Sequence, residues 1–307
     1  MSYILRTHHV TKTYQGKEAV SDVSMNVRKG EIYGFLGPNG AGKTTMMRMI
    51  TNLVKPTGGE IEIFGERLAD ASYGVLGRIG SIIEYPIFYD RLTAYENLDI
   101  HCEYMGYHNK KAIGEALKLV NLYGIEGKAV KDFSLGMKQR LGIARAVLTK
   151  PELLILDEPI NGLDPVGIKE LRDLFKVLSR EYGITLLISS HILGEIEQIA
   201  DTVGVINGGK MIQEVSMEQI KERNVDYIEL TTDDCAKAAF VLEHHLNISN
   251  LRVIDNRFIR VYDGGLNQSE LTKSLVMHDI AIESIRKQNS SLEDYFLQLL
   301  NGGEMSA

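Results

Sequence analysis

Cysteine is scarce in this 307-residue sequence, which contains Cys102 and Cys235 and no other. The two lie far apart and form no C-x-x-C pair, so the sequence offers neither a disulfide framework nor a cysteine-based metal site. Such usage is typical of a reducing compartment. We expect both cysteines to be buried as small apolar side chains.

Long hydrophobic runs are also missing. No apolar stretch approaches the roughly 18 residues of a membrane-spanning helix, and the first residues, 1–7, lack a basic region leading into an apolar one. These absences predict a chain that neither crosses a membrane nor is exported. The composition, 44% hydrophobic and 24% charged, also argues against disorder and against a collagen-like structure.

Positive charge is in slight deficit, since 34 Lys and Arg face 41 Asp and Glu, for a formal net charge of −7. This acidic balance argues against a protein built mainly to hold nucleic-acid phosphates, and we expect no nucleic-acid partner. The pairs His8-His9 and His244-His245 have no third ligand at metal spacing, so we interpret them as ordinary residues.

The length predicts two domains. Up to about residue 220, short apolar runs alternate with helical segments, which is the pattern of an α/β domain with a mostly parallel sheet. Residues 55–66 predict a small antiparallel element, and residues from about 90 to 150 predict a helical insertion. We place this first domain at residues 1–222. Its expected parallel strands lie at 32–36, 79–83, 153–156, 184–188 and 203–206.

Residues 223–307 predict a smaller C-terminal α+β domain. Its expected elements are a strand over 227–231, a helix capped by Asp233 or Asp234 and running to Leu246, a hairpin over 252–262 turning at Asp255-Asn256, a helix over 268–277, a strand over 280–285 and an amphipathic helix over 292–300.

A phosphate-binding motif follows the first of the parallel strands. Residues 37–44 match G-x-x-x-x-G-K-[ST] and precede a predicted helix over 44–52. Glycines let backbone N–H groups surround a phosphate, and the helix N-terminus adds partial positive charge. Lys43 would bridge the β- and γ-phosphates and Thr44 would ligate Mg²⁺. A glycine-rich turn without a ligand is the alternative, but it gives the Lys-Thr pair no purpose.

A pair of carboxylates, Asp157 and Glu158, follows the apolar run 153–156. Ligands bind at the carboxyl ends of parallel strands, so both are expected beside the phosphates. Asp157 would hold Mg²⁺ through water, and Glu158 would polarise the attacking water. Taken alone, the pair could be ordinary loop acids after a core strand; the phosphate-binding motif favours the catalytic interpretation.

With these motifs in place, residues 3–220 resemble the ATP-binding subunit of an ABC transporter. Residues 133–141, FSLGMKQRL, are similar to the ABC signature, usually LSGGQ, with two departures. Ser134 can cap the helix that follows, whose N-terminus forms an anion site. The resemblance implies that Ser134 and Gly136 contact a γ-phosphate held by the opposite subunit, so that one chain is half of a catalyst.

Two further segments follow in the order of the family. Residues 161–165 resemble the D-loop, which implies that Asp164 reaches the dimer interface. Residues 189–191 resemble the switch-histidine segment, which implies that His191 bonds the γ-phosphate and helps to orient Glu158 and water. Without the family pattern, His191 would be an ordinary histidine at a strand end.

The resemblance also implies ATP as the nucleotide. Tyr14 matches the aromatic residue that stacks on adenine, although a single tyrosine near an N-terminus is otherwise more often a packing residue. The implied ATP contacts are Tyr14, Gly37, Pro38, Asn39, Gly40, Ala41, Gly42, Lys43, Thr44 and Thr45.

Glu84 stands where the family usually has Gln, a residue that reaches Mg²⁺ and starts the loop touching the membrane subunit. With its flanks at 86–89 and 92–98, it resembles the bacitracin and lantibiotic exporters. Glu can still offer an oxygen to Mg²⁺, so Thr44, Asp157 and Glu84 are the expected metal ligands. The alternative is a solvent-facing loop residue.

The family implies a P-loop ATPase that works as a homodimer at the cytoplasmic face of the cell membrane and powers a separate transmembrane permease. The implied cargo is a peptide antibiotic such as bacitracin or a lantibiotic, contacted through the permease. Alternatives are an ABC-2-type exporter of another substrate, a repair or translation ABC ATPase, and a module that holds nucleotide without turnover. The sequence shows neither the long coiled coil of repair relatives nor the second ATP domain of translation relatives, and Glu158 and His191 argue for turnover.

Overall fold

The chain divides into two compact units, Met1–Met217 and Glu218–Ala307. The predicted boundary after residue 222 lies slightly beyond this division and stays a prediction. The amphipathic helix predicted over 292–300 and the turn at Asp255-Asn256 lie outside the described residues. The computed structural model describes residues 2–69, 72–125, 127–223, 226–246, 248, 250–254, 257–262 and 267–289.

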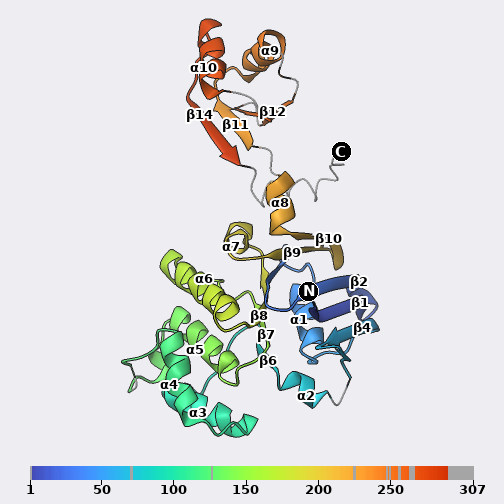
Figure 1. The fold of residues 1–307 in the computed structure, drawn as a ribbon, viewed down its shortest axis with the longest axis vertical. Coiled ribbons are helices and arrows are strands. Elements are labelled where there is room, and N and C mark those ends of the chain that lie inside the picture. The colour runs from blue at the N-terminus through green and yellow to red at the C-terminus, as the bar shows by residue number, and fades with distance from the viewer. Residues whose placement is uncertain are drawn as a thin grey trace. The chain divides into compact units, whose positions relative to one another are not determined.

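A six-stranded sheet, ordered β10-β9-β3-β8-β7-β6, forms the centre of the first unit (Figure 1). Neighbouring strands are parallel except that β10 runs antiparallel to β9. Every residue of β3, β7 and β8 is buried, as the apolar runs without polar alternation at 153–156 and 184–188 indicate for β7 and β8. The strands are β3 (Ile32–Leu36), β6 (Ile79–Ile82), β7 (Leu153–Asp157), β8 (Thr185–Ser190), β9 (Thr202–Asn207) and β10 (Lys210–Ser216).

A second, antiparallel sheet is larger than the sequence predicted. Its order is β2-β1-β4-β5, and only its β4 and β5 fall in the expected element at 55–66. The sequence analysis missed both long strands. In β1 the apolar residues do not alternate, because its register against β2 shifts at several points, whereas Val23, Met25 and Val27 of β2 do alternate and could have indicated a strand. The strands are β1 (Tyr3–Tyr14), β2 (Lys17–Arg28), β4 (Gly58–Ile63) and β5 (Glu66–Arg67).

The first helix, α1 (Lys43–Ile50), packs between the two sheets. Met46 and Met49 are fully buried in one cluster with Val10 of β1 and Ile155 of β7. This packing holds the helix that follows the phosphate-binding motif against the carboxyl end of the parallel sheet.

The predicted helical insertion lies between β6 and β7, and Figure 1 shows α3, α4 and α5 grouped away from β1, β2 and β4. Thr93 and Glu96 form a capping box at the start of α3. The insertion contains α3 (Ala94–Met105), α4 (Lys110–Leu119), a 3₁₀ turn (Val130–Asp132) and α5 (Leu135–Val147). The other helices of this unit are α2 (Tyr73–Leu76), α6 (Pro165–Arg180) and α7 (Leu193–Glu197).

The second unit is an α+β domain with the antiparallel sheet order β12-β13-β11-β14. Its β-α-β-β-α-β succession is typical of ferredoxin-like domains. Asp234 caps α9 by accepting from the N–H of Lys237. After α8 (Met217–Arg223), the elements are β11 (Asp226–Thr231), α9 (Cys235–His245), β12 (Leu251–Ile254), β13 (Phe258–Val261), α10 (Gln268–Met277) and β14 (Ser284–Asn289).

One boundary in this unit was predicted wrongly. The strand expected over 280–285 begins only at Ser284, which pairs with Thr231 of β11. Ile280 is buried in the core of the unit without belonging to a strand. Ile280 is apolar because it packs in the core beneath the sheet. Where β14 begins is set instead by its register with β11.

Two other sequence predictions can be compared with the structure. Cys102 and Cys235 are both free and buried, as predicted. In the described parts of the chain, no helix combines the length and the apolarity that crossing a membrane requires.

Candidate functional site

The site is assembled at the carboxyl ends of three neighbouring parallel strands. In the ladder, Leu36 at the end of β3 pairs with Ser190 of β8, and Asp157 at the end of β7 pairs with Ser189. The segments that follow these strands must therefore emerge side by side at one edge of the sheet. This register brings together residues that are more than 100 positions apart in the sequence.

The phosphate-binding loop depends on glycine where other parts of the chain approach it. A Cβ on Gly37 would lie 2.3 Å from the carbonyl oxygen of Ile206, and one on Gly42 would lie 2.7 Å from that of Ala19. Gly42 also has a φ of 107° and supplies no side-chain cap to α1. The N–H groups of the first helical turn are thus available to an anion such as a phosphate.

Lys43 lies in the centre of this loop, with a side chain that is 6% exposed. Its Nζ donates to the carbonyl oxygens of Gly37 at 2.7 Å and of Pro38 at 3.2 Å. These bonds hold the ammonium group inside the loop, where it can meet the negative charge of a bound phosphate.

Thr44, in the first turn of α1, and Asp157, at the end of β7, are joined by a hydrogen bond between their side chains. The Thr44 hydroxyl donates to Asp157 Oδ2 at 2.8 Å, and the Ser189 hydroxyl donates to Oδ1 at 2.6 Å. Asp157 is 2% exposed. Hydroxyl and carboxylate oxygens are the ligands that Mg²⁺ prefers, so the donor set fits this ion.

Glu158 is held by charged or ionisable partners on two sides. His191 Nδ1 lies 2.8 Å from its Oε2, and Lys43 Nζ lies 3.2 Å from its Oε1. Oε1 is buried, and beyond its ion pair with Lys43 it accepts no hydrogen bond from the described residues. The carboxylate is therefore fixed in orientation while one oxygen keeps its capacity to accept a proton from water.

Ser189 is a site residue whose part the sequence analysis missed. Its hydroxyl donates to Asp157 and accepts from the backbone N–H of Glu158 at 2.9 Å, and the residue is fully buried. It thus fixes both carboxylate residues at once. The signal that could have found it is the parallel alignment of the two predicted strands, which sets Asp157 opposite Ser189.

The signature segment and the D-loop lie against each other. Ser134 caps α5 by accepting from the N–H of Met137, and Asp164 caps α6 by accepting from the N–H of Gly167 at 3.1 Å. A Cβ on Gly136 would lie 3.6 Å from Leu163. In the part of the chain that the structure describes, neither Ser134 nor Asp164 forms a hydrogen bond to the phosphate-binding loop.

The remaining predicted residues lie around this centre. Tyr14 ends β1 with a ring that is 42% exposed, and Lys12 Nζ lies 5.0 Å from the ring centre. Glu84 follows β6 with a φ of 63°, and its half-exposed carboxylate forms an ion pair with Arg48 of α1. No contact described in the structure joins Glu84 to Thr44 or Asp157.

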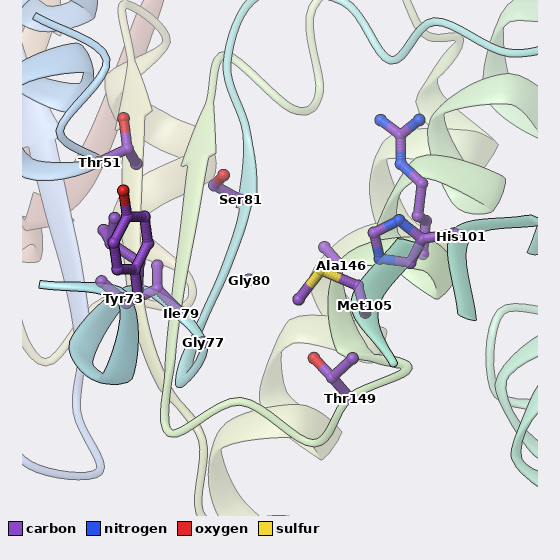
Figure 2. Close-up of a pocket in the computed structure, with 12 residues that line it drawn as sticks. Thr51, Tyr73, Gly77, Ile79, Gly80, Ser81, His101, Met105, Ala146 and Thr149 are labelled. Atoms are coloured by element: carbon purple, nitrogen blue, oxygen red, sulfur yellow. The ribbon is translucent and has the colours of Figure 1, made fainter. Parts of the chain in front are cut away.

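A pocket of about 410 Å³ lies beside β6. Figure 2 shows Tyr73 and Thr51 on one side of it and His101 and Met105 of α3 on the other. Burial, and secondarily the charge of Arg145, lower the pKa of His101, while burial also lowers the pKa of Arg145. The predicted ATP contacts do not line this pocket.

The fold and the site define a P-loop ATPase, and comparison with known proteins specifies the family. Residues 20–161 match the ABC transporter family. The chain is 63% identical to the uncharacterized ABC transporter ATP-binding protein YcbN of Bacillus subtilis, over 100% of both chains. It is 50% identical to the bacitracin transport ATP-binding protein BcrA of Bacillus licheniformis, over 99% of both.

A solved structure agrees with these relatives. It is the dimeric post-hydrolysis state of the ATP-binding cassette MJ0796 bound to ADP and Pi, which matches with a TM-score of 0.64 and 27% identity over 69% of this chain and 98% of that one. The chain belongs to the ABC transporter family, as an ATP-binding subunit. The predicted fold class, a P-loop ABC ATPase domain, is confirmed.

Proposed function

We propose that this chain hydrolyses Mg²⁺-bound ATP as a homodimer at the cytoplasmic face of the cell membrane, and that the energy drives a permease exporting a peptide antibiotic of the bacitracin class. The observation that carries the catalytic part is the contact of Glu158 with both His191 and Lys43. A carboxylate with this support, next to a phosphate-binding loop, fits a residue that positions water for in-line attack.

In this proposal the loop residues bind the phosphates, and the residues at the strand ends hold Mg²⁺ and position the attacking water. Lys43 and the N–H groups of the first turn of α1 hold the β- and γ-phosphates. Thr44 and Asp157 hold the Mg²⁺, which would neutralise charge that develops on the phosphates. Glu158 accepts a hydrogen bond from the attacking water, and His191 keeps Glu158 oriented toward it.

The signature residues act on the nucleotide of the partner subunit. Ser134 and Gly136 start α5, where the helix N-terminus favours an anion, yet neither is bonded to the phosphate-binding loop of its own chain in the described residues. Asp164, at the start of α6, lies in the same region and would contact the partner across the interface. The dimeric state of the similar cassette MJ0796 supports this arrangement.

The cargo is proposed from the similarity to the bacitracin transport protein BcrA, which extends over 99% of both chains. Deleting the gene for this chain should lower the bacitracin concentration that its host tolerates. Expression of the intact chain should restore tolerance, while the Glu158→Gln variant should not. Unchanged tolerance after the deletion, with ATP hydrolysis by the purified chain intact, would exclude bacitracin and leave the ATPase assignment standing.

A further inference from the structure

Arg48 and Glu84 form an ion pair that the sequence motifs do not explain. Arg48 lies in the last turn of α1, and Glu84 lies two residues after the end of β6. Their side chains are 38% and 51% exposed. Because Glu84 occupies the position expected to reach Mg²⁺, its partner bears directly on the nucleotide site.

Helix geometry places Arg48 above Thr44. The two residues are four positions apart on α1, so their side chains share one face of the helix. Side chains on a helix lean toward its N-terminus, which brings the guanidinium of Arg48 toward the turn that contains Thr44. Thr44 in turn donates to Asp157. The ion pair is therefore on the side of α1 that carries Thr44, where the residues proposed to bind the phosphates and Mg²⁺ lie.

Sheet geometry places Glu84 at the same edge. β6 and β7 are parallel neighbours in which Ile82 pairs with Leu156. Glu84 comes two residues after Ile82, and Asp157 comes directly after Leu156. Two independent features, the helix face and the strand register, thus place the Arg48–Glu84 pair beside the proposed metal ligands.

Charge balance gives this pair a purpose. Asp157 and Glu158 are carboxylates beside the place where a triphosphate would bind, and Lys43 already pairs with Glu158. Glu84 adds a third carboxylate at the same edge of the sheet, and negative charges gathered there oppose the binding of an anionic nucleotide. The fixed positive charge of Arg48 offsets that of Glu84, and its planar guanidinium also fixes where the carboxylate lies.

We propose that Arg48 is a positioning residue that holds Glu84 beside the nucleotide site and neutralises its charge, so that MgATP binds next to three carboxylates. The proposal rests on the proposed function, in which MgATP binds at the loop and the strand ends, and on the sequence prediction that Glu84 stands at the position that serves Mg²⁺. Glu84 and Arg48 then act as a unit: Arg48 matters to nucleotide binding only while Glu84 is present.

The test is a double-mutant cycle on MgATP affinity. The full-length chain carrying Glu158→Gln, which blocks turnover, would be compared with and without Arg48→Gln, Glu84→Gln and both together, using isothermal titration with MgATP. Arg48→Gln alone should weaken binding about fivefold, the size expected for one uncompensated charge at partial exposure. In the Glu84→Gln background the same change should have less than about a twofold effect.

A matched control is Arg78→Gln. Arg78 pairs with Glu152 at 2.8 Å with similar exposure, 41% and 40%, but it precedes β6 whereas Glu84 follows it. This change should leave MgATP affinity unaltered. Arg48→Lys keeps the charge without the planar fork, so we expect an intermediate affinity. Far-ultraviolet circular dichroism would establish that each variant is folded.

Two outcomes would overturn the proposal. One is an equal loss of affinity on Arg48→Gln with and without Glu84; the other is no loss in either background. Either result, if the unsubstituted chain still binds MgATP, would exclude the proposed role of Arg48 and leave the proposed function standing. Failure of the unsubstituted chain to bind MgATP would instead contradict the proposed function.

Discussion

His191 Nδ1 lies 2.8 Å from Glu158 Oε2, so two residues that follow different strands, β8 and β7, share one interaction. Lys43, from a third chain segment, approaches the other oxygen of the same carboxylate at 3.2 Å. The carboxylate is thus oriented by the loop that would bind the phosphates and by a histidine from the neighbouring strand.

Replacement of Glu158 by Gln should lower kcat for ATP hydrolysis by about 10²- to 10⁴-fold, because the amide cannot accept a proton from water. ATP affinity should persist, and the dimer should accumulate with ATP bound, which size-exclusion chromatography with light scattering would detect. Glu152→Gln, at the opposite end of β7, is the control and should hydrolyse ATP normally. Near-normal turnover by Glu158→Gln would remove the assignment of the base.

Replacement of His191 by Ala should lower kcat by about 10²-fold and change KM little, because the imidazole orients a catalytic group. Steady-state kinetics over a range of MgATP concentrations would separate the two constants. His244→Ala is a suitable control, since His244 contacts the Phe240 carbonyl within its own helix. A rise in KM with kcat unchanged would assign His191 to binding instead.

Removal of the Ser189 hydroxyl should lower the stability of the folded protein. In Ser189→Ala, Asp157 loses a hydrogen bond of 2.6 Å and the N–H of Glu158 loses its acceptor. We expect a loss of about 1–3 kcal/mol in the free energy of unfolding, since buried polar groups are left without partners. Urea denaturation would measure it. The neighbouring comparison is Ser190→Ala, which removes the acceptor of the Ile192 N–H but no bond to a carboxylate, so its loss should be smaller. Equal effects of the two changes would show that the position of Ser189 is not special.

His101 should make the folded protein less stable in mild acid. Burial and the neighbouring Arg145 lower the pKa of His101 in the folded protein. Below about pH 6.5, His101 is therefore protonated in the unfolded chain while it stays neutral in the folded chain. The free energy of unfolding should then fall as the pH drops from 7.5 to 5.5. His101→Gln should make that fall shallower in urea titrations at the two pH values. An unchanged slope would show that other groups account for it.

The first domain should bind nucleotide by itself. The loop, the strand ends and α1 all lie within the unit Met1–Met217. A chain ending at residue 222 should therefore bind MgATP with an affinity close to that of the full chain, as measured by isothermal titration. A folded but non-binding fragment would show that the second unit contributes to the site, and would contradict the proposed domain boundary.

The chemistry of the site could be predicted from the sequence because it depends on short motifs. The glycines of 37–44 lie together in the chain, the carboxylates at 157 and 158 are neighbours, and the cap formed by Ser134 directly precedes its helix. Such features need only local backbone geometry, and the apolar runs of β7 and β8 predicted their burial for the same reason. The chemical role of each segment could therefore be predicted without knowing where the segment lies in the tertiary structure.

The sequence by itself thus determined the phosphate-binding loop, the strand that leads to the acidic pair, the helical insertion and the succession of elements from β11 to α10 in the second unit. Only the tertiary structure decided the irregular strand β1 and its pairing with β2, the link that Ser189 makes between the Asp157 carboxylate and the Glu158 backbone N–H, and the pairing of Arg48 with Glu84. These contacts join residues far apart in the chain, so they depend on strand register and helix packing. One residue of slip would move every side chain to the other face of the sheet, and no local pattern specifies that alignment.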